Sequence, residues 1–311
     1  MVPDVVTVGD INLDLITEPM QVDLAKQKEM EIISKGFWQA LGGNAGNYAM
    51  AVANLGLKSR LIGALSDDPI SKWLMEILEK NGVEFRICFK EKSSAITFAL
   101  TYADGTRTFI SDLGANQLLS LDDIDLSLIE GKHLHRAGYW WAPKFMGKGT
   151  KQLFRIAKEK GLTTSLDIAW DPQGWTLERR TGVYECLEYC DILFLNNKEL
   201  QSLTLLELDE GAHFLLEKGV HLIGLHYGER GCRIYDGQKV LQIPSFRVQL
   251  NNPTGTGDVY NAAFIYGYLQ KWDLARIGKF ANARSSLHLI DRTKPYPTVK
   301  EIQNFLATYK E

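Results

Sequence analysis

The sequence predicts an α/β fold, a three-layer αβα sandwich in which helices cover both faces of a mainly parallel sheet. Three observations support this prediction. Short apolar runs alternate with amphipathic stretches along most of the 311 residues, which is the pattern of parallel strands joined by helical crossovers. Ile192–Leu195 is apolar throughout, as in a strand that is covered on both faces. Gly56 and Gly82 each follow an amphipathic stretch, at the position where a helix is expected to end.

The first half of the chain contains two strand–helix pairs. Val5–Val8 is a β-branched run and predicts the first strand. Ala45–Leu55 has apolar residues at helical spacing and predicts a helix. A second strand over Arg60–Ile62 and a second helix over Ser71–Asn81 follow. No signal peptide is expected, because no basic region followed by an apolar run precedes this first strand.

The second half repeats this alternation and ends in helices. Helices are expected over Thr150–Lys160, Leu208–Lys218 and Val259–Leu269, and strands over Leu162–Ile168, Ile192–Leu195 and Val220–Leu225. Asp236-Gly237 predicts a hairpin between Cys232–Tyr235 and Val240–Ile243. The last helix is expected to start at Thr298, because Glu301 three residues later completes a capping box.

A small β-rich lobe is expected near the N-terminus. Ala95–Tyr102 alternates in strand fashion, reaches Asp104-Gly105, and returns through Thr106–Ile110, which is a strong hairpin signal. Val22–Ala40 shows no clear long helix and has room for short strands. We therefore interpret residues 1–311 as one domain, with a small β-sheet lid formed by about residues 12–40 and 94–111 inserted in it.

The composition is that of a soluble globular protein, with 45% hydrophobic and 23% charged residues. A formal net charge of −3 gives no reason to expect nucleic acid or an anionic membrane as a partner. The four cysteines show no Cys-x-x-Cys spacing, and no apolar stretch approaches the length of a membrane span. A cytoplasmic location is expected.

The most informative motif is Asn252–Asp258, which leads into the helix expected over Val259–Leu269. Gly255 and Gly257 allow a tight turn and leave N–H groups unobstructed, and a helix N-terminus attracts phosphate. A carboxylate beside a phosphate is unfavourable unless Asp258 takes a proton from an attacking hydroxyl. The alternative is a glycine-rich turn with a capping aspartate.

Two polar segments in the N-terminal region are suited to a polyol. Gly42 and Gly43 permit close approach of the backbone to a ligand, and Asn47 can both donate and accept hydrogen bonds. Asn12 and Asp14 follow the first strand and alternate with apolar residues, so they are expected to face the same way. A capped loop and a hydrophilic turn are the alternatives for these two segments.

A third polar segment, Asn196-Asn197-Lys198-Glu199, follows the apolar strand Ile192–Leu195. A carboxylate at a strand end can hold a magnesium ion through water. The alternative is an acidic residue that begins a helix, which is common.

In this order, the four segments resemble the motifs of the ribokinase-like (PfkB) family of carbohydrate kinases, and the resemblance extends over nearly the whole chain. Gly255–Asp258 looks like the C-terminal signature of that family, and Gly42-Gly43 with Asn47 looks like its N-terminal signature. Asn196 and Glu199 match its Asn-x-x-Glu motif. Gly228-Glu229-Arg230-Gly231 matches its Gly-x-x-Gly nucleotide loop.

The resemblance implies an ATP- and magnesium-dependent kinase that phosphorylates a hydroxyl of a small sugar or sugar derivative. Asp258 would be the base, and the N–H groups of Gly255, Thr256, Gly257 and Asp258 would form the anion hole. The residues implied for the sugar are Asn12, Asp14, Gly42, Gly43, Asn47 and, from the lid, Arg107. Those implied for the nucleotide and magnesium are Asn196, Glu199 (through water), Gly228, Gly231 and Asn282.

Three departures from the family pattern are present. Asn252-Pro253 replaces the usual Asp-Thr, which makes activation by a monovalent cation such as potassium doubtful. His226 stands where threonine is frequent, before the Gly-x-x-Gly loop. Asp291–Pro295 replaces a Gly-Ala turn near the adenine. None of these departures affects Asp258 or the two glycines before it.

Two rival functions remain open. Tyr139-Trp140-Trp141 is interpreted as core packing, but rings of this kind could also stack on a sugar or base, which keeps a nucleoside kinase of the same fold as an alternative. A sugar or nucleotide sensor without turnover is the other. His133 and His135 are interpreted as hydrogen-bonded structural residues. The sequence leaves open the acceptor and its hydroxyl, and a homodimer through the lid is our expectation for the assembly.

Overall fold

The computed structural model describes residues 2–21, 31–104, 106–249, 255–290 and 296–309. Its main sheet has nine strands in the order β13-β12-β11-β10-β9-β8-β1-β4-β5. Seven neighbouring strands are parallel, and β12 and β13 pair antiparallel at one edge. The strands are β1 (Val5–Val8), β4 (Ser59–Leu65), β5 (Val83–Phe89), β8 (His133–Arg136), β9 (Thr163–Asp167), β10 (Ile192–Asn196), β11 (Leu222–His226), β12 (Cys232–Tyr235) and β13 (Val240–Ile243).

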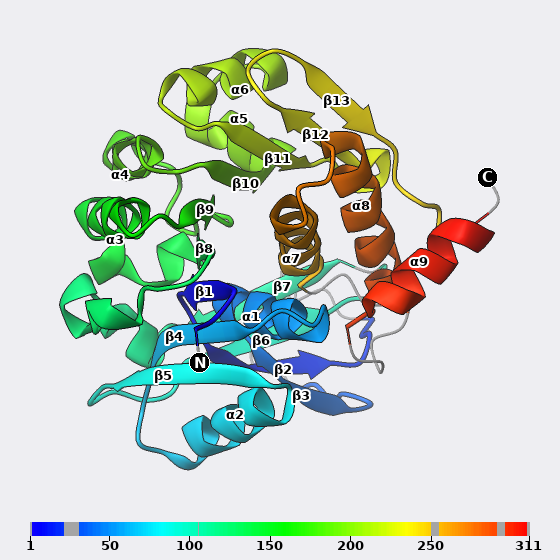
Figure 1. The fold of residues 1–311 in the computed structure, drawn as a ribbon. Helices are drawn as coiled ribbons and strands as arrows, with labels where there is room; N and C mark the ends of the chain where they lie inside the picture. Colours follow the sequence, from blue (N-terminus) through cyan, green and yellow to red (C-terminus); the bar gives the residue numbers. More distant parts are fainter. Residues whose placement is uncertain (1, 22–30, 105, 250–254, 291–295, 310–311) are drawn as a thin grey trace.

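Helices cover both faces of this sheet, so the predicted three-layer sandwich is confirmed (Figure 1). One layer holds α3 (Lys148–Glu159), α4 (Leu177–Leu187), α5 (Asn197–Thr204) and α6 (Leu208–Glu217). The other holds α1 (Asn44–Asn54), α7 (Thr256–Leu269), α8 (Leu274–Ile290) and α9 (Val299–Thr308), while α2 (Pro69–Lys80) packs near β5. In the described part of the chain, three apolar clusters fill the space between the sheet and these helices.

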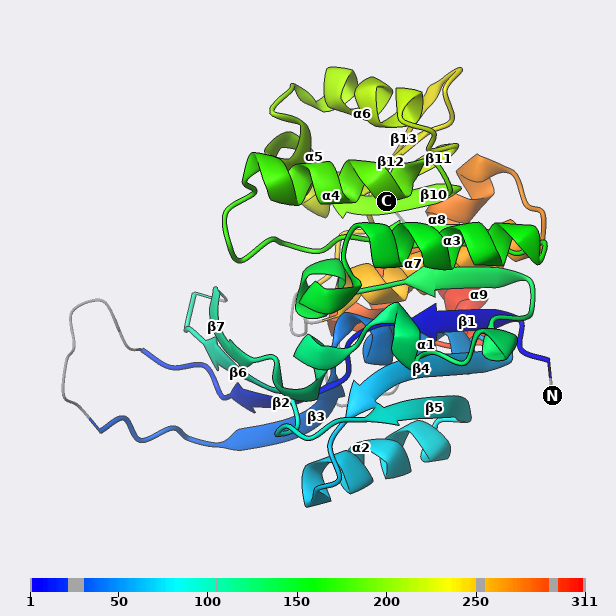
Figure 2. The same ribbon diagram turned by 90° about the vertical axis from the view of Figure 1, so that its left-hand side faces the viewer.

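A second sheet of four strands stands apart from the main one (Figure 2). Its order is β3 (Phe37–Gly42), β2 (Asn12–Thr17), β6 (Ile96–Thr101) and β7 (Arg107–Asp112). The β6–β7 hairpin follows the Asp104-Gly105 signal of the sequence, although residue 105 itself lies outside the described residues. We refer to these four strands as the lid sheet.

Most predicted elements lie within two residues of the observed ones, and local signals explain why. Thr298 and Glu301 form the predicted capping box at α9. Asp68 accepts a hydrogen bond from the Ser71 N–H and so begins α2 two residues earlier than the apolar pattern suggested. Within the part of the chain that the structure describes, no helix is long and apolar enough to cross a membrane.

Candidate active site

The carboxyl ends of several parallel strands bring polar side chains to one edge of the main sheet. Asp167, Asn196 and His226 are the last residues of β9, β10 and β11, and Asp10 follows β1. The N-terminus of α7, with Asp258 in its first turn, reaches the same edge. This is the edge at which open α/β sheets bind ligands.

Asp258 is almost completely buried and is held by two side chains of α1. The Asn44 amide donates to Oδ1 of Asp258 at 3.4 Å, and the Asn47 amide donates to Oδ2 at 3.3 Å. Gly255 precedes the helix with φ 69°, a left-handed conformation that favours glycine. A Cβ on Gly255 would lie 3.3 Å from the Asn47 amide nitrogen, so the turn and α1 are in close approach.

Burial raises the pKa of the Asp258 carboxyl well above its usual value, and nearby Asp167 and Asp10 add to this effect. The amides of Asn44 and Asn47 act in the opposite direction but do not offset it. A carboxylate with raised proton affinity is a better general base than an ordinary surface aspartate. The environment of Asp258 therefore suits proton transfer.

Backbone geometry at the start of α1 depends on the two adjacent glycines. Gly43 has φ 84°, and a Cβ there would lie 2.5 Å from the carbonyl oxygen of Asp10. The Asp10 carboxylate in turn accepts hydrogen bonds from the N–H groups of Asn44 and Ala45, at 3.1 and 3.3 Å. A Cβ on Gly42 would lie 2.3 Å from the Asp14 carboxyl carbon, so only glycine fits beside this side chain.

Strand register places three predicted residues on one face of the lid sheet. Asn12 and Asp14 share a face of β2, because side chains alternate along a strand. Asp14 pairs with Thr97 of β6, and Thr101 of β6, on the same face, pairs with Arg107. We call this face of the lid sheet its inner face.

The Asn12 amide donates to Oδ1 of Asp14 at 2.5 Å. Burial raises the pKa of Asp14 to about 7, although the Asn12 bond and the positive charge of Arg107 both lower it. Arg107 is therefore electrostatically coupled to Asp14, which is consistent with the shared face.

Glu199 and Asp167 are two buried carboxyls that lie close enough for their charges to interact. Asn196 caps α5 by accepting from the Lys198 and Glu199 N–H groups, and Glu199 Oε2 accepts from the Asn196 N–H at 2.7 Å. Burial and the nearby Asp167 raise the pKa of Glu199 to about 8. Burial raises the pKa of Asp167 to about 6, and the Asn261 amide donates to its Oδ2 at 2.5 Å.

The burial of Glu199 predicts how stability depends on pH. In the folded chain the Glu199 carboxyl keeps its proton up to about pH 8, whereas in the unfolded chain this carboxyl releases its proton near pH 4.5. The folded state thus binds more protons in this window, so its stability falls as pH rises through it. Glu199→Gln keeps the capping box but not the ionisable group. We expect its Tm to exceed that of the wild type at pH 8 and to match it near pH 4.5, measured by calorimetry without ligand.

The capping box of α9 supplies the matched control for this experiment. Glu301→Gln makes the same change at an exposed site, and its Tm should follow the wild type at both pH values. If Glu199→Gln were less stable than the wild type at pH 8, the buried-charge interpretation of Glu199 would be wrong.

The three residues implied for the nucleotide lie together near the end of β13. Gly231 has φ 88°, and a Cβ there would lie 2.1 Å from the Ile243 carbonyl oxygen. The Asn282 amide donates to the carbonyls of Ile243 and Pro244, both at 3.0 Å. Gly228 has φ 58°, and a Cβ there would meet no atom within 4 Å. Gly231 and Asn282 thus both contact the backbone at Ile243 and Pro244, whereas the space beside Gly228 is open.

Sequence reasoning missed several residues that complete the site. The Asn44 amide donates to Asp258, and the charge of Asp167 raises the pKa of Asp258. The Asn261 amide donates to Asp167, and His226 Nε2 lies 2.8 Å from Oδ1 of Asn261. Tyr296 donates to Oδ1 of Asn47 at 3.3 Å. Asp167 ends β9, whose sequence Thr163-Thr164-Ser165-Leu166-Asp167 forms no recognisable motif, so no local signal pointed to it. His226 was noticed, but only as a departure from a pattern.

The surroundings of Tyr139, Trp140 and the two histidines agree with the structural interpretation, whereas Trp141 is only half-buried. Tyr139 and Trp140 are buried in the core beneath α3 and α4. His133 Nδ1 lies 2.7 Å from the Thr163 hydroxyl, and His135 Nδ1 lies 2.6 Å from the Ser165 hydroxyl. Among the described residues, no three His, Cys, Asp or Glu side chains are grouped so as to hold a metal ion.

Comparison with known proteins gives one consistent result. The family model described as pfkB family carbohydrate kinase matches residues 2–292. A 5-dehydro-2-deoxygluconokinase of Clostridium perfringens is 27% identical over 99% of this chain and 94% of its own length. A probable fructokinase-5 of Arabidopsis thaliana is 28% identical over 85% of this chain and 82% of its own length.

A solved structure shares the fold. The crystal structure of a putative ribokinase II from E. coli, in complex with ATP and magnesium, aligns with a TM-score of 0.86. The alignment covers 99% of this chain and 100% of the other, at 22% sequence identity. Both the large sheet with its helix layers and the overall topology are therefore those of this structural group.

Proposed function

The chain belongs to the pfkB family of carbohydrate kinases, and we propose that it transfers the terminal phosphoryl group of ATP to a hydroxyl of a small sugar or sugar derivative. The observation that carries this proposal is the buried Asp258 at the start of α7, whose carboxyl pKa is raised by burial and which is held by two amides of α1. A carboxylate at a helix N-terminus with raised proton affinity is matched to deprotonating an alcohol beside a phosphate.

In the proposed mechanism, Asp258 accepts the proton of the acceptor hydroxyl as its oxygen attacks phosphorus. The first backbone hydrogen bond of α7 runs from the Val259 N–H to the Gly255 carbonyl. Within the described part of the chain, the N–H groups of Gly257 and Asp258 before it have no acceptor. These donors, with those of Gly255 and Thr256, form the anion hole for the transferred group, since a helix N-terminus carries partial positive charge.

Magnesium fits the pair formed by Glu199 and Asp167. The nearby Asp167 contributes to the raised pKa of Glu199, because two buried carboxyls repel each other's charge, and a divalent cation would relieve that repulsion. Bound magnesium would neutralise charge on the phosphates of ATP. Because two carboxylates are too few to enclose the ion, Glu199 would hold it through water, with Asn196 fixing the orientation of Glu199.

The adenosine part of ATP is assigned to the Gly228–Gly231 loop and the segment fastened by Asn282. The open space at Gly228 allows backbone approach to a ligand. The Asn282 amide donates to the carbonyls of Ile243 and Pro244. Asn282 would therefore shape the nucleotide site by fixing this backbone segment. Asn252-Pro253 and Asp291–Pro295 lie outside the described residues, and the doubt about potassium activation stays a prediction from sequence.

The acceptor is assigned to the inner face of the lid sheet, where Asn12 and Asp14 would bind its hydroxyls beside Gly42, Gly43 and Asn47. Closure of the lid sheet would exclude water and limit wasteful hydrolysis of ATP. Arg107 on the same face would bind an anionic group of the acceptor. The names of the relatives include both a neutral-sugar kinase and a sugar-acid kinase.

A panel of acceptors tests this proposal. ADP release is measured with fructose, ribose, 5-dehydro-2-deoxygluconate and adenosine. We expect turnover with at least one sugar. If the best acceptor is an acid, Arg107→Met should raise the KM for that acid at least tenfold. The same variant should leave the KM for neutral sugars within twofold of the wild type. Turnover with adenosine alone would favour the nucleoside kinase. Ligand binding without any ADP release would favour the sensor.

The outer face of the lid sheet supports a homodimer. Phe37, Phe98 and Ile110 are 62%, 41% and 59% exposed. Strand alternation puts all three on the face opposite Asp14, and Phe98 pairs directly with Ile110. A second copy of the chain would cover this apolar face. Sedimentation equilibrium should give twice the chain mass, and a monomer at micromolar concentration would contradict the proposal.

A further inference from the structure

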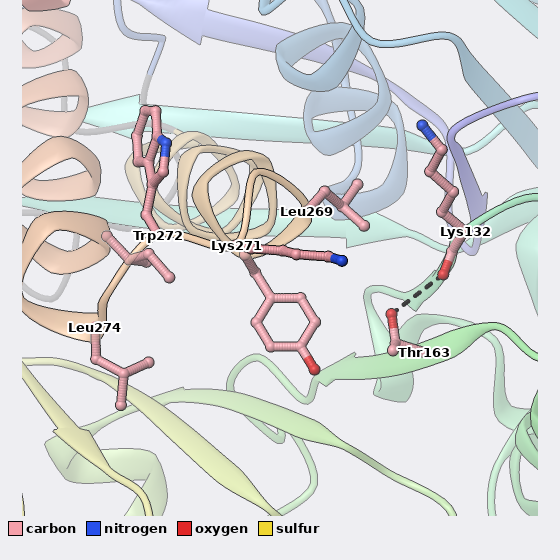
Figure 3. Close-up of a pocket in the computed structure, with 8 residues that line it drawn as sticks. Lys132, Thr163, Leu269, Lys271, Trp272 and Leu274 are labelled. Atoms are coloured by element: carbon pink, nitrogen blue, oxygen red, sulfur yellow. Dashed lines mark hydrogen bonds between the residues drawn. The ribbon is translucent and has the colours of Figure 1, made fainter.

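A pocket of about 420 Å³ lies at the amino edge of the main sheet, the edge opposite the carboxylates of the proposed active site (Figure 3). It is bounded by the starts of β8 and β9, at Lys132 and Thr163, and by the junction of α7 and α8. Its volume is typical of small-molecule sites. No residue of the proposed active site lines it.

One wall of the pocket is apolar and firmly packed. It consists of Leu269, Trp272, Leu274 and Ile277. The Trp272 ring packs edge-on against two aromatic rings behind it, and the Arg276 guanidinium lies 4.0 Å from its centroid. A Cβ on Gly267 would lie 3.0 Å from this ring, which shows how closely it is held. The wall thus offers a fixed surface to a flat apolar group.

Two polar groups on the pocket are without partners. Within the described ranges, the Lys271 ammonium forms no ion pair and the Tyr268 hydroxyl forms no hydrogen bond. Lys271 extends from the end of α7 toward the side formed by Lys132 and Thr163 (Figure 3). The acids nearby are engaged elsewhere, since Asp4 pairs with Lys132 at 2.8 Å and Asp191 with Lys158 at 2.6 Å. A cation and a donor with no acceptor favour an anion.

The backbone at Lys271 is unusual for a lysine. Its φ is 58°, in the left-handed region, and the Trp272 N–H bonds to the Gly267 carbonyl at 3.1 Å. This is the helix-ending motif in which glycine is the usual residue, because a side chain disfavours the left-handed conformation. The chain keeps a long cationic side chain beside the pocket in spite of that cost.

We propose that this pocket binds an organic anion with a flat apolar body. The anionic group would lie between the Lys271 ammonium and the Tyr268 hydroxyl, and the body would lie against Trp272 and Leu274. The ligand would contact the C-terminal end of α7, whose first turn carries Asp258. The site is separate from the proposed acceptor and ATP sites, so the proposal does not depend on the proposed function.

Titration calorimetry with 1-naphthalenesulfonate tests the proposal. The full chain is titrated both without ATP and saturated with ATP, because ATP excludes the probe from the nucleotide site. We expect binding to the wild type and at least tenfold weaker binding to Lys271→Gly, a change that the left-handed backbone tolerates. Lys218→Ala is the matched control, because Lys218 also lies at a helix end beside an aromatic ring, 5.0 Å from Phe214. Its affinity should stay within twofold of the wild type.

A second variant keeps the proposal testable if Lys271→Gly folds poorly. Leu274 is the first residue of α8, where a glutamate is favoured by the helix dipole. Leu274→Glu puts a negative charge on the pocket wall and should abolish binding of the sulfonate. Equal binding to the wild type and both variants, equal binding of neutral naphthalenemethanol, or no binding to the wild type at millimolar probe would each overturn the proposal.

Discussion

Asp258→Asn is expected to lower kcat by about a hundred- to ten-thousand-fold, the range that general base catalysis contributes. Asparagine has the size of aspartate and can still accept from one of the two α1 amides that hold Asp258. It cannot take a proton from the acceptor hydroxyl. The KM values for ATP and the acceptor should therefore change by less than about threefold, and steady-state kinetics measures all three constants.

The control for this variant is a second aspartate in the first turn of a helix. Asp209 lies in the first turn of α6, is exposed, and is paired with Arg233. Asp209→Asn makes the same loss of charge at a helix N-terminus and should leave kcat within twofold of the wild type. An Asp258→Asn enzyme that kept more than about a third of the wild-type rate would remove Asp258 from the role of base.

Asp14→Ala is expected to give the second largest effect, a fall in kcat/KM for the acceptor of roughly a hundredfold. Hydrogen bonds to a charged group are worth about 1.5–3 kcal/mol each, and Asp14 is placed to bind acceptor hydroxyls on the inner face of the lid sheet. The KM for ATP should not change, because the residues assigned to ATP come from other elements. Initial rates with each substrate varied in turn measure the two effects separately.

Gln39→Ala is the control for the Asp14 variant. Gln39 is exposed on β3 of the same sheet and pairs with Leu15, so it lies on the opposite face. Its replacement should leave both KM values unchanged. An acceptor KM within threefold of the wild type for Asp14→Ala would show that the inner face does not hold the acceptor.

Much of the fold could be predicted because local signals agree with it. Asp104-Gly105 predicts the β6–β7 hairpin, and Thr298 with Glu301 predicts the start of α9. The order of the main sheet could not be predicted in this way. Val5–Val8 pairs with Ser59–Leu65 on one side and with His133–Arg136 on the other, and no local pattern specifies partners that far apart. The strand Phe37–Gly42 is likewise defined by pairing with β2.

Some residues of the candidate site could likewise be predicted from local motifs, and others could not. Asp258, Asn47 and Glu199 stand in motifs whose spacing has a chemical reason, and each lies at the carboxyl edge of the sheet or on the start of a helix there. Asp167 and Asn44 carry no such local signal. They become significant only because folding brings β9 and α1 against the first turn of α7. No pattern within one sequence indicates that β9 and α1 meet the first turn of α7 in the folded chain.

The central claim is that Asp258 deprotonates the acceptor while the first N–H groups of α7 hold the transferred phosphoryl group. The most direct measurement is a crystal structure with an acceptor and a non-hydrolysable ATP analogue bound together. We expect one acceptor hydroxyl oxygen within about 3.2 Å of an Asp258 carboxylate oxygen, with the Gly257 and Asp258 N–H groups directed at the terminal phosphate. An acceptor oxygen beyond about 5 Å from Asp258, with those N–H groups directed elsewhere, would contradict the account.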